Sequence, residues 1–255
     1  MKFFIFLLVR VLYRFRAYNT NVLKTPGPLL LIPNHTSWID WAFLGSILDD
    51  DWRFVTSSTT AQISWMHRLV MLNRRTFPVD PASPYAVKRM AEFLEKGGKL
   101  VLFSEGRISL TGTLGKIFDG TGFLLSKTKA RAICCYLRGA YRLPLSPNAD
   151  QKKWFPHVSA HFSDVLTPPP FESLNAEDRR TLLSEWLRDR LLAQQFETEQ
   201  LFGPKNVLAA IVNTAQEYPK RIILEDATGQ TLTYRELLTG ARLFWPHMES
   251  AAAFG

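Results

Sequence analysis

The chain has 255 residues, which is enough to bury the core of one α/β domain and to carry a small appended region. Its formal net charge of +8 favours anionic partners such as phospholipid headgroups, an acidic carrier protein or nucleic acid. The sequence contains no basic repeat, recognition-helix pattern or zinc-binding spacing, so it argues against nucleic acid as the partner and offers no metal site.

The first 20 residues are predicted to form a membrane-associating helix. The apolar run Phe3–Val9 falls far short of the ~20 residues that a membrane-spanning helix needs, and no small-x-small cleavage site follows it, as a signal peptide would require. Arg10, Arg14 and Arg16 alternate with apolar residues at helical spacing, which favours a helix lying in the plane of the lipid headgroups. The alternative is an ordinary core helix with snorkelling arginines.

His35 and Asp40 lie at the first polar turn that closes an apolar run. Leu29–Ile32 indicates a buried strand, and Trp38–Leu44 indicates the opening of a helix. A histidine at such a turn can take a proton from a hydroxyl, while an aspartate one helical turn further on can accept the other imidazole N–H. By itself the pair also fits a histidine that caps a helix with an aspartate on its solvated face. The chemistry that it suggests is general-base activation of an alcohol.

Strands and helices alternate between this turn and a second one. We expect a helix over 42–48 ending at three aspartates, a strand over 53–56, a hydrophobic helix over 64–72, a strand over 77–79 and a helix over 85–96 stopped by two glycines. The apolar run Leu100–Phe103 then precedes Ser104-Glu105-Gly106-Arg107-Ile108-Ser109. Two polar turns that each close an apolar strand are what an α/β active site at the carboxyl edge of a sheet needs.

The remaining elements support an α/β fold. They are a helix over 118–127, strands over 132–137 and 158–162 and a helix over 176–196, so the alternation predicts a mainly parallel sheet flanked by helices. Cys134 and Cys135 are neighbours on a predicted strand and point to opposite faces, so they cannot form an ordinary disulfide. We interpret them as small apolar residues in a reducing cytosol.

Taken together, these motifs resemble the glycerolipid acyltransferase family, whose marks are an Asn-His-x4-Asp block and a Phe-Pro-Glu-Gly block at about this separation. Ser104 stands where that family usually has proline. The resemblance is closer to the acyltransferase half of the bacterial bifunctional 2-acylglycerophosphoethanolamine acyltransferase/acyl-carrier-protein synthetases. It covers about residues 1–200 and rests on four further blocks: Arg10–Arg14, Phe77–Pro81, Glu105–Gly112 and Lys116–Phe123.

The resemblance implies an acyl transfer without cofactor or metal. By this resemblance, His35 deprotonates the free hydroxyl of a lysophospholipid, most simply 2-acylglycerophosphoethanolamine. Asp40 orients the imidazole and stabilises its charged form. Glu105 and Gly106 bind the acceptor, Arg107 offers a fork for a phosphodiester, and Ser109 adds a hydroxyl. The donor is a thioester of acyl carrier protein or coenzyme A. The enzyme is expected at the cytoplasmic face of the bacterial inner membrane, attached without spanning it.

Asp80 bears on the choice of acceptor. It stands in Phe77-x-x-Asp80, where lysophosphatidic acid acyltransferases carry Phe-x-x-Arg to bind a phosphomonoester. An aspartate there would repel a dianionic phosphate and attract an ammonium such as ethanolamine, unless it only caps a turn or Arg74 or Arg75 compensates for it. Lysophosphatidic acid acylation is therefore the enzymatic alternative. A non-catalytic, membrane-bound lipid-binding remnant is the alternative of another class.

Residues 201–255 differ in composition from the rest. We expect a helix over 207–212, a β-hairpin over 221–234 and a helix over 235–244. Thr231–Leu237 resembles the first segment of acyl-adenylate-forming synthetases, so this region is interpreted as the start of such a domain. It lacks the Ser/Thr/Gly-rich phosphate loop with which those enzymes bind ATP, so ligase activity is not implied.

Overall fold

The computed structural model describes residues 2–65, 68, 71–80, 83, 85–147, 152–171 and 173–252. The chain divides into two compact units, Met1–Glu197 and Thr198–Gly255. The division falls three residues before the boundary expected from the sequence, at 200/201. Each unit is described by itself.

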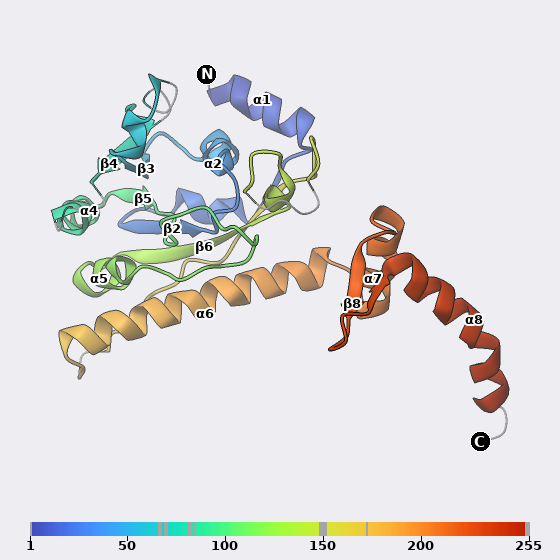
Figure 1. Ribbon diagram of the computed structural model, residues 1–255. Helices are drawn as coiled ribbons and strands as arrows, with labels where there is room; N and C mark the ends of the chain where they lie inside the picture. Colours follow the sequence, from blue (N-terminus) through green and yellow to red (C-terminus); the bar gives the residue numbers. More distant parts are fainter. Residues whose placement is uncertain are drawn as a thin grey trace. The chain divides into compact units, whose positions relative to one another are not determined.

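Among the described residues, the first unit contains a seven-stranded sheet in the order β1-β7-β6-β2-β5-β3-β4 (Figure 1). β2 to β6 run parallel, whereas β7 is antiparallel to β6 and carries β1 with it in the reversed direction. The mainly parallel sheet predicted from the sequence is thus confirmed. The strands are β1 (Arg16–Tyr18), β2 (Leu29–Pro33), β3 (Trp52–Ser57), β4 (Thr76–Val79), β5 (Lys99–Val101), β6 (Arg131–Arg138) and β7 (Ser159–Phe162).

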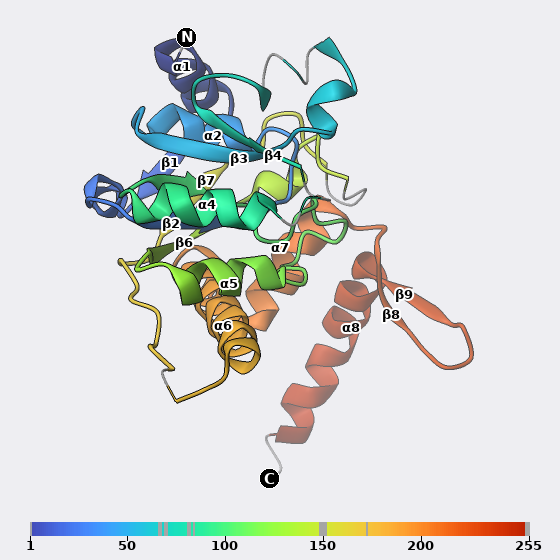
Figure 2. The same ribbon diagram turned by 90° about the vertical axis from the view of Figure 1, so that its left-hand side faces the viewer.

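Helices cover both faces of this sheet (Figures 1 and 2). On one face α1 (Lys2–Leu12) and α2 (Asp40–Ile47) pack together, and on the other lie α4 (Tyr85–Glu95), α5 (Asp119–Lys127) and α6 (Ala176–Phe202). Successive strand residues alternate between the faces: Leu31 and Cys135 join the core under α2, while Ile32 and Cys134 join the core under α5 and α6. The two cysteines point to opposite faces as expected, and both are free thiols.

All five residues of β2 are buried, which is why its sequence reads as a continuous apolar run. The strands β2, β3, β4, β5 and β6 end at one edge of the sheet, called here the carboxyl edge. Because β1 and β7 run in reverse, they begin at this same edge. Both polar turns singled out in the sequence therefore meet there, after the neighbouring strands β2 and β5.

The N-terminal region differs from the single helix expected over the first 20 residues. α1 ends at Leu12, and Arg16 already begins the edge strand β1, because its backbone N–H donates to Val158 O at 3.3 Å. Val9 is buried in the core, whereas Leu7, Leu8 and Val11 are exposed. Among the described residues no helix is long and apolar enough to cross a bilayer.

Smaller differences concern element ends. The strand expected over 100–103 is β5, Lys99–Val101, and the helix expected over 176–196 continues to Phe202. The helix expected over 64–72 falls partly on residues 66–67 and 69–70, which lie outside the described residues.

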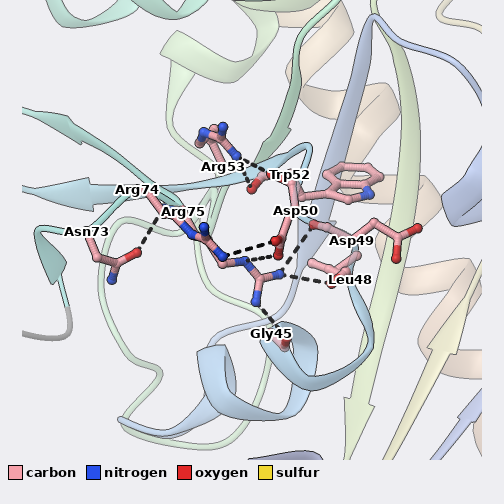
Figure 3. A network of polar contacts seen from close by, with 9 residues as sticks. All are labelled: Gly45, Leu48, Asp49, Asp50, Trp52, Arg53, Asn73, Arg74 and Arg75. Atoms are coloured by element: carbon pink, nitrogen blue, oxygen red, sulfur yellow. Dashed lines mark hydrogen bonds and ion pairs between the residues drawn. The ribbon is translucent and has the colours of Figure 1, made fainter. Parts of the chain in front are cut away.

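Arg75 anchors the C-terminal end of α2 (Figure 3). Its guanidinium donates to the carbonyl oxygens of Gly45 at 3.0 Å and Leu48 at 2.9 Å, which have no partner within the helix, and it lies 3.6 Å from a carboxylate oxygen of Asp50. Arg74 pairs with the other Asp50 oxygen at 3.2 Å. Both arginines precede β4 and so lie at the edge opposite to Asp80. The suggestion that they compensate for Asp80 is therefore wrong.

The second unit consists of α7 (Val207–Glu217), a hairpin of β8 (Ile222–Glu225) and β9 (Thr231–Thr233), and α8 (Tyr234–Ala252). Asn206 caps α7 by accepting the Ala209 N–H at 2.8 Å. The helix, hairpin and helix follow the order expected from the sequence. The hairpin turn is closed by Asp226, whose carboxylate accepts the backbone N–H groups of Thr228 and Gln230.

His161 is a buried, neutral histidine in β7. Its ring stacks on Tyr18 with centroids 4.6 Å apart, and Nε2 lies 2.8 Å from the Ser159 hydroxyl. Burial, together with the positive charges of Arg138 and His157, lowers the pKa of His161 to about 4. Folding therefore requires this imidazole to stay uncharged.

Acidification is expected to weaken the first unit through His161. The unfolded histidine binds a proton near pH 6.5 and the folded one near pH 4, so stability present above pH 6.5 is lost as the pH falls towards 4, by about 2 kcal/mol at pH 5. Denaturant titrations at pH 7.5 and pH 5 measure this loss, which His161→Phe should reduce. The exposed neighbour provides a control: His157→Gln should retain most of the loss. An unchanged pH dependence in His161→Phe would contradict the assignment.

Candidate active site

The expected contact between His35 and Asp40 is present. His35 Nδ1 lies 2.9 Å from Asp40 Oδ2, and the side chains are 20% and 0% exposed, respectively. A carboxylate can only accept, so Nδ1 carries the proton and Nε2 keeps its lone pair. Among the described residues Nε2 has no hydrogen-bond partner, so the basic nitrogen is left to meet a substrate.

The same Asp40 oxygen also holds the turn after β2. It accepts the backbone N–H of Thr36 at 2.7 Å and that of Ser37 at 2.9 Å. Asp40 begins α2, two residues later than the helix start expected at Trp38, so its charge lies at the positive end of the helix dipole. The carboxylate thus fixes the turn, the helix start and the imidazole together.

Glu105 connects the two motifs. One carboxylate oxygen, Oε1, accepts the backbone N–H of His35 at 3.1 Å, and the other, Oε2, accepts that of Gly115 at 2.7 Å. The residue is 4% exposed, and burial raises the pKa of its carboxyl although the two backbone hydrogen bonds oppose that rise. The sequence predicted that Glu105 touches the acceptor, but the structure shows both oxygens engaged by the backbone. We therefore describe Glu105 as a brace under His35.

Phe103 sets the plane of the imidazole. Its ring stacks on His35 with centroids 4.1 Å apart and planes inclined by 28°. Phe103 follows β5 and His35 follows β2, so the stacking joins the same two turns that Glu105 connects. The imidazole is held at Nδ1 and on one face, which leaves Nε2 as its open end.

Gly106 occupies a position that favours glycine. Its φ of 64° lies in the left-handed region, and a Cβ atom there would come within 2.4 Å of the Phe118 ring. The turn is closed by the Gly106 N–H donating to Phe103 O at 3.0 Å, and the Phe118 N–H donates to Ser104 O at 2.9 Å. Gly106 lies at the surface beside the site, as an acceptor-binding residue requires.

Ser109 is also used internally. Its backbone N–H donates to His35 O at 2.7 Å, and its buried hydroxyl donates to Thr113 O at 2.7 Å. The hydroxyl expected to bind substrate also closes the loop 109–113. Ser109 supports His35 from the carbonyl side, as Glu105 does from the N–H side.

Arg107 and Asp80 are both exposed, but only Arg107 adjoins His35's supports. Among the described residues Arg107 makes no hydrogen bond or ion pair, so its guanidinium is open to an anionic group. Asp80 follows β4, three strands from β2, which corresponds to roughly 14 Å across the sheet. Its carbonyl accepts the Ser83 N–H at 3.0 Å, which closes a turn whose middle residues lie outside the described residues.

The buried thiols are not alternative nucleophiles. Burial raises the pKa of Cys134 to about 12 and that of Cys135 well above its ordinary value, so both stay protonated. Within the described ranges, no group of three His, Cys, Asp or Glu side chains is arranged to hold a metal ion. The chemistry that the site offers is proton abstraction by His35.

Sequence reasoning missed three supports of the site. Asn34 continues the ladder beyond β2, accepting the Leu137 N–H at 2.7 Å through Oδ1. Gly115 donates to Glu105, and a Cβ atom at Gly115 would lie 3.0 Å from Oε2. Phe103 was expected at the end of a strand and at the start of the second motif, but its stacking on His35 was not predicted. The signal was present for Asn34, which directly precedes His35, whereas nothing in the sequence pairs Gly115 with Glu105.

Comparison with known proteins agrees with this geometry. A family model described as Acyltransferase matches residues 14–144, just over half of the chain. The structure is similar to the 1-acyl-sn-glycerophosphate (LPA) acyltransferase PlsC from Thermotoga maritima, with a TM-score of 0.53. The two sequences are 14% identical, and the match covers 76% of this chain and 81% of that chain. At this identity the likeness shows a shared fold, the mainly parallel sheet flanked by helices.

The brace role of Glu105 predicts a specific response to Glu105→Gln. The amide nitrogen of the new side chain would face a backbone N–H at either His35 or Gly115, leaving one buried donor without an acceptor at a cost of about 1–3 kcal/mol. We expect a lower melting temperature and faster hydrogen exchange at the amides of His35 and Gly115. Glu95→Gln, at an exposed position on α4, is the matched control and should change neither. Unchanged exchange in Glu105→Gln would rule out the brace.

Proposed function

The chain belongs to the acyltransferase family and is an O-acyltransferase, and we propose that it transfers an acyl group from a thioester to the free hydroxyl of a lysophospholipid. The observation that supports this most directly is the His35–Asp40 pair, with Nδ1 held by a buried carboxylate and Nε2 open at the carboxyl edge. The donor is an acyl thioester of acyl carrier protein or coenzyme A.

The reaction needs one base and no covalent enzyme intermediate. His35 Nε2 takes the hydroxyl proton as the acceptor oxygen attacks the thioester carbonyl. Asp40 stabilises the imidazolium that forms, because its carboxylate lies 2.9 Å from Nδ1. When the tetrahedral intermediate collapses, the C–S bond breaks, and the imidazolium returns its proton to the departing thiolate. The products are the diacyl phospholipid and the free carrier thiol, and His35 is regenerated neutral.

For the acceptor we propose 2-acylglycerophosphoethanolamine. Arg107 offers its guanidinium to the phosphodiester, and Gly106 allows the acceptor close to the backbone beside Phe118. Asp80 supplies a negative charge at the same edge of the sheet, which favours an ammonium over a phosphomonoester. Arg74 and Arg75 cannot reverse this charge because they lie at the opposite edge, at the end of α2.

Two alternatives have some support. Acylation of lysophosphatidic acid is favoured by the likeness to the Thermotoga maritima protein, a 1-acyl-sn-glycerophosphate acyltransferase that shares the fold. A non-catalytic lipid-binding role would not require the catalytic base to be kept during evolution. The intact arrangement around His35 argues against this role: Asp40 and Glu105 make their hydrogen bonds, and Phe103 stacks on the imidazole.

We further propose attachment to the cytoplasmic face of the bacterial inner membrane through the exposed face of α1, where Leu7, Leu8 and Val11 lie. The second unit is proposed to belong to an adenylate-forming synthetase domain, on the resemblance of Thr231–Leu237. No ligase activity is assigned to it.

Replacing the base is expected to abolish transfer. His35→Ala should lower turnover by roughly 10²–10⁴-fold, because a positioned base contributes about that much. Asp40→Asn should lower turnover less, since the imidazole remains but loses the charge that stabilises its protonated form. The assay supplies acyl carrier protein thioester or acyl-coenzyme A with each lysolipid and identifies the diacyl product. His157→Ala is the control at an exposed histidine. More than a tenth of normal turnover in a folded His35→Ala protein would disprove the mechanism.

Reversing the charge at Asp80 tests the acceptor. Asp80→Arg should lower activity on lysophosphatidylethanolamine and raise it on lysophosphatidic acid, changing their ratio by roughly tenfold, since exposed charge pairs are each worth about 1 kcal/mol or less. Asp189→Arg, at an exposed position of α6, makes the same charge change and should leave the ratio unchanged. An equal response of both substrates to Asp80→Arg would make Asp80 a turn residue and remove the support for ethanolamine.

A further inference from the structure

The segment Lys152–Phe155 presents an unusual surface for a loop. It reads Lys-Lys-Trp-Phe, and all four residues are exposed, with Trp154 at 77% and Phe155 at 60% of their full exposure. Large aromatic rings held in water are unfavourable unless they have a partner. Two lysines beside them indicate that the partner is anionic.

This loop is fixed at the carboxyl edge beside the end of α1. Phe155 packs against Tyr13 with ring centroids 5.9 Å apart, and the Val158 N–H donates to Tyr13 O at 3.1 Å. The Lys153 N–H donates to Arg142 O at 2.7 Å. Because β7 begins directly after the loop and runs antiparallel to β6, the loop lies where the parallel strands end. It therefore shares an edge with the candidate site.

Exposed apolar side chains follow the parallel strands at the carboxyl edge, and they are sparse in the turns that precede those strands at the opposite edge, where Leu72 is exposed just before segment 73–75. Among the described residues, each of the strands β2 to β6 is followed by at least one such side chain: Trp38 after β2, Ile63 and Trp65 after β3, Tyr85 after β4, Leu110 and Phe118 after β5, and Leu145, Trp154 and Phe155 after β6. At the opposite edge, the described segments 49–51, 73–75, 96–98 and 128–130 contain charged, polar and small residues only.

The loop region also touches the turn that carries the base. The Trp38 N–H donates to Leu145 O at 3.2 Å, and Trp38 lies three residues after His35. A surface that binds Lys152–Phe155 would therefore lie next to the turn that carries His35.

We propose that Lys152–Phe155 is a second membrane anchor, separate from α1, that inserts Trp154 and Phe155 among the headgroups of an anionic bilayer. Indole and phenyl rings favour the membrane–water interface, and Lys152 and Lys153 neighbour lipid phosphates. The anchor rests on the lipid acceptor of the proposed function, since it turns the edge that holds His35 towards the membrane. With the end of α1 beside the loop, both anchors turn the carboxyl edge, and the site on it, towards the layer that contains the substrate.

The test places a fluorescent label at the loop through Trp154→Cys. Cys134 and Cys135 are buried, so the introduced thiol is the one that reacts. On vesicles of phosphatidylcholine with phosphatidylglycerol, a label at position 154 should be quenched by lipids carrying a spin label near the headgroup. Phe196→Cys on α6, where the native ring is 64% exposed, is the matched control and should not be quenched. α6 covers the face of the sheet opposite to α1.

Vesicle sedimentation measures the contribution of each side chain without any thioester present. Trp154→Ser with Phe155→Ser should lower the vesicle partition coefficient by at least tenfold, whereas Phe196→Ser should not. Lys152→Glu with Lys153→Glu should lower it by about tenfold on anionic vesicles and weaken its salt dependence. The α1 variant Leu8→Ser with Val11→Ser should also lower the vesicle partition coefficient, and its effect should add to that of the loop variants.

The outcomes decide the proposal separately from the transfer activity, because vesicle binding by the His35→Ala protein should equal that of the natural chain. An unquenched label at position 154 on bound protein would overturn the loop anchor, and so would failure to bind anionic vesicles. A label that responds to acyl carrier protein and not to vesicles would identify a protein partner instead, and would also overturn it.

Discussion

A carboxylate with no exposure to water lies at the first turn of α2, where three donors meet one of its oxygens, Oδ2, and offset the cost of burying the charge, while the buried Oδ1 has no hydrogen-bond partner among the described residues. Asp40 Oδ2 collects two backbone N–H groups from the turn after β2 and the Nδ1–H of His35, and the helix dipole adds to their effect. Removing any donor would leave a buried charge partly uncompensated. The need to neutralise Asp40 therefore fixes the histidine tautomer, and with it the outward direction of Nε2. At the other end of the helix, Arg75 satisfies the last carbonyls, so α2 is held at both termini (Figure 3).

Glu105 extends this constraint to the second motif. It holds the His35 backbone from the turn after the neighbouring strand, while Phe103 stacks on the ring and the Ser109 N–H binds the carbonyl oxygen. The motif Phe-x-Glu-Gly is thus explained largely as support for the base. That leaves Arg107 and Gly106 as the residues of this turn that face outward. The division agrees with an enzyme that binds a phosphodiester beside a rigid base.

The sequence predicted the sheet, most of its helices and the His35–Asp40 contact, because each rests on local signals: apolar runs, helix stops and a spacing of five residues. It could not predict that β7 pairs antiparallel to β6, nor the direction of β1, which follows from its pairing with β7 between residues about 140 positions apart. For the same reason it placed Arg14 and Arg16 in a helix, although the chain turns into a strand there. The internal hydrogen bonds of Glu105 and Ser109 were not predicted, because a sequence motif gives residue types and not partners. Backbone donors such as Gly115 N–H leave no mark in the sequence.

The parallel sheet connects these observations to the lipid. All five parallel strands end at one edge, so their connecting loops gather the base, its supports and the exposed aromatic side chains in one place. The opposite edge receives the turns with Asp49, Asp50 and Asp51, which suit water. The common direction of the parallel strands thus separates one edge of the sheet that suits lipid from the opposite edge that suits solvent. An acceptor that lives in the bilayer would then meet His35 without leaving the headgroup layer, while a thioester carried by a soluble donor reaches the same edge from the water.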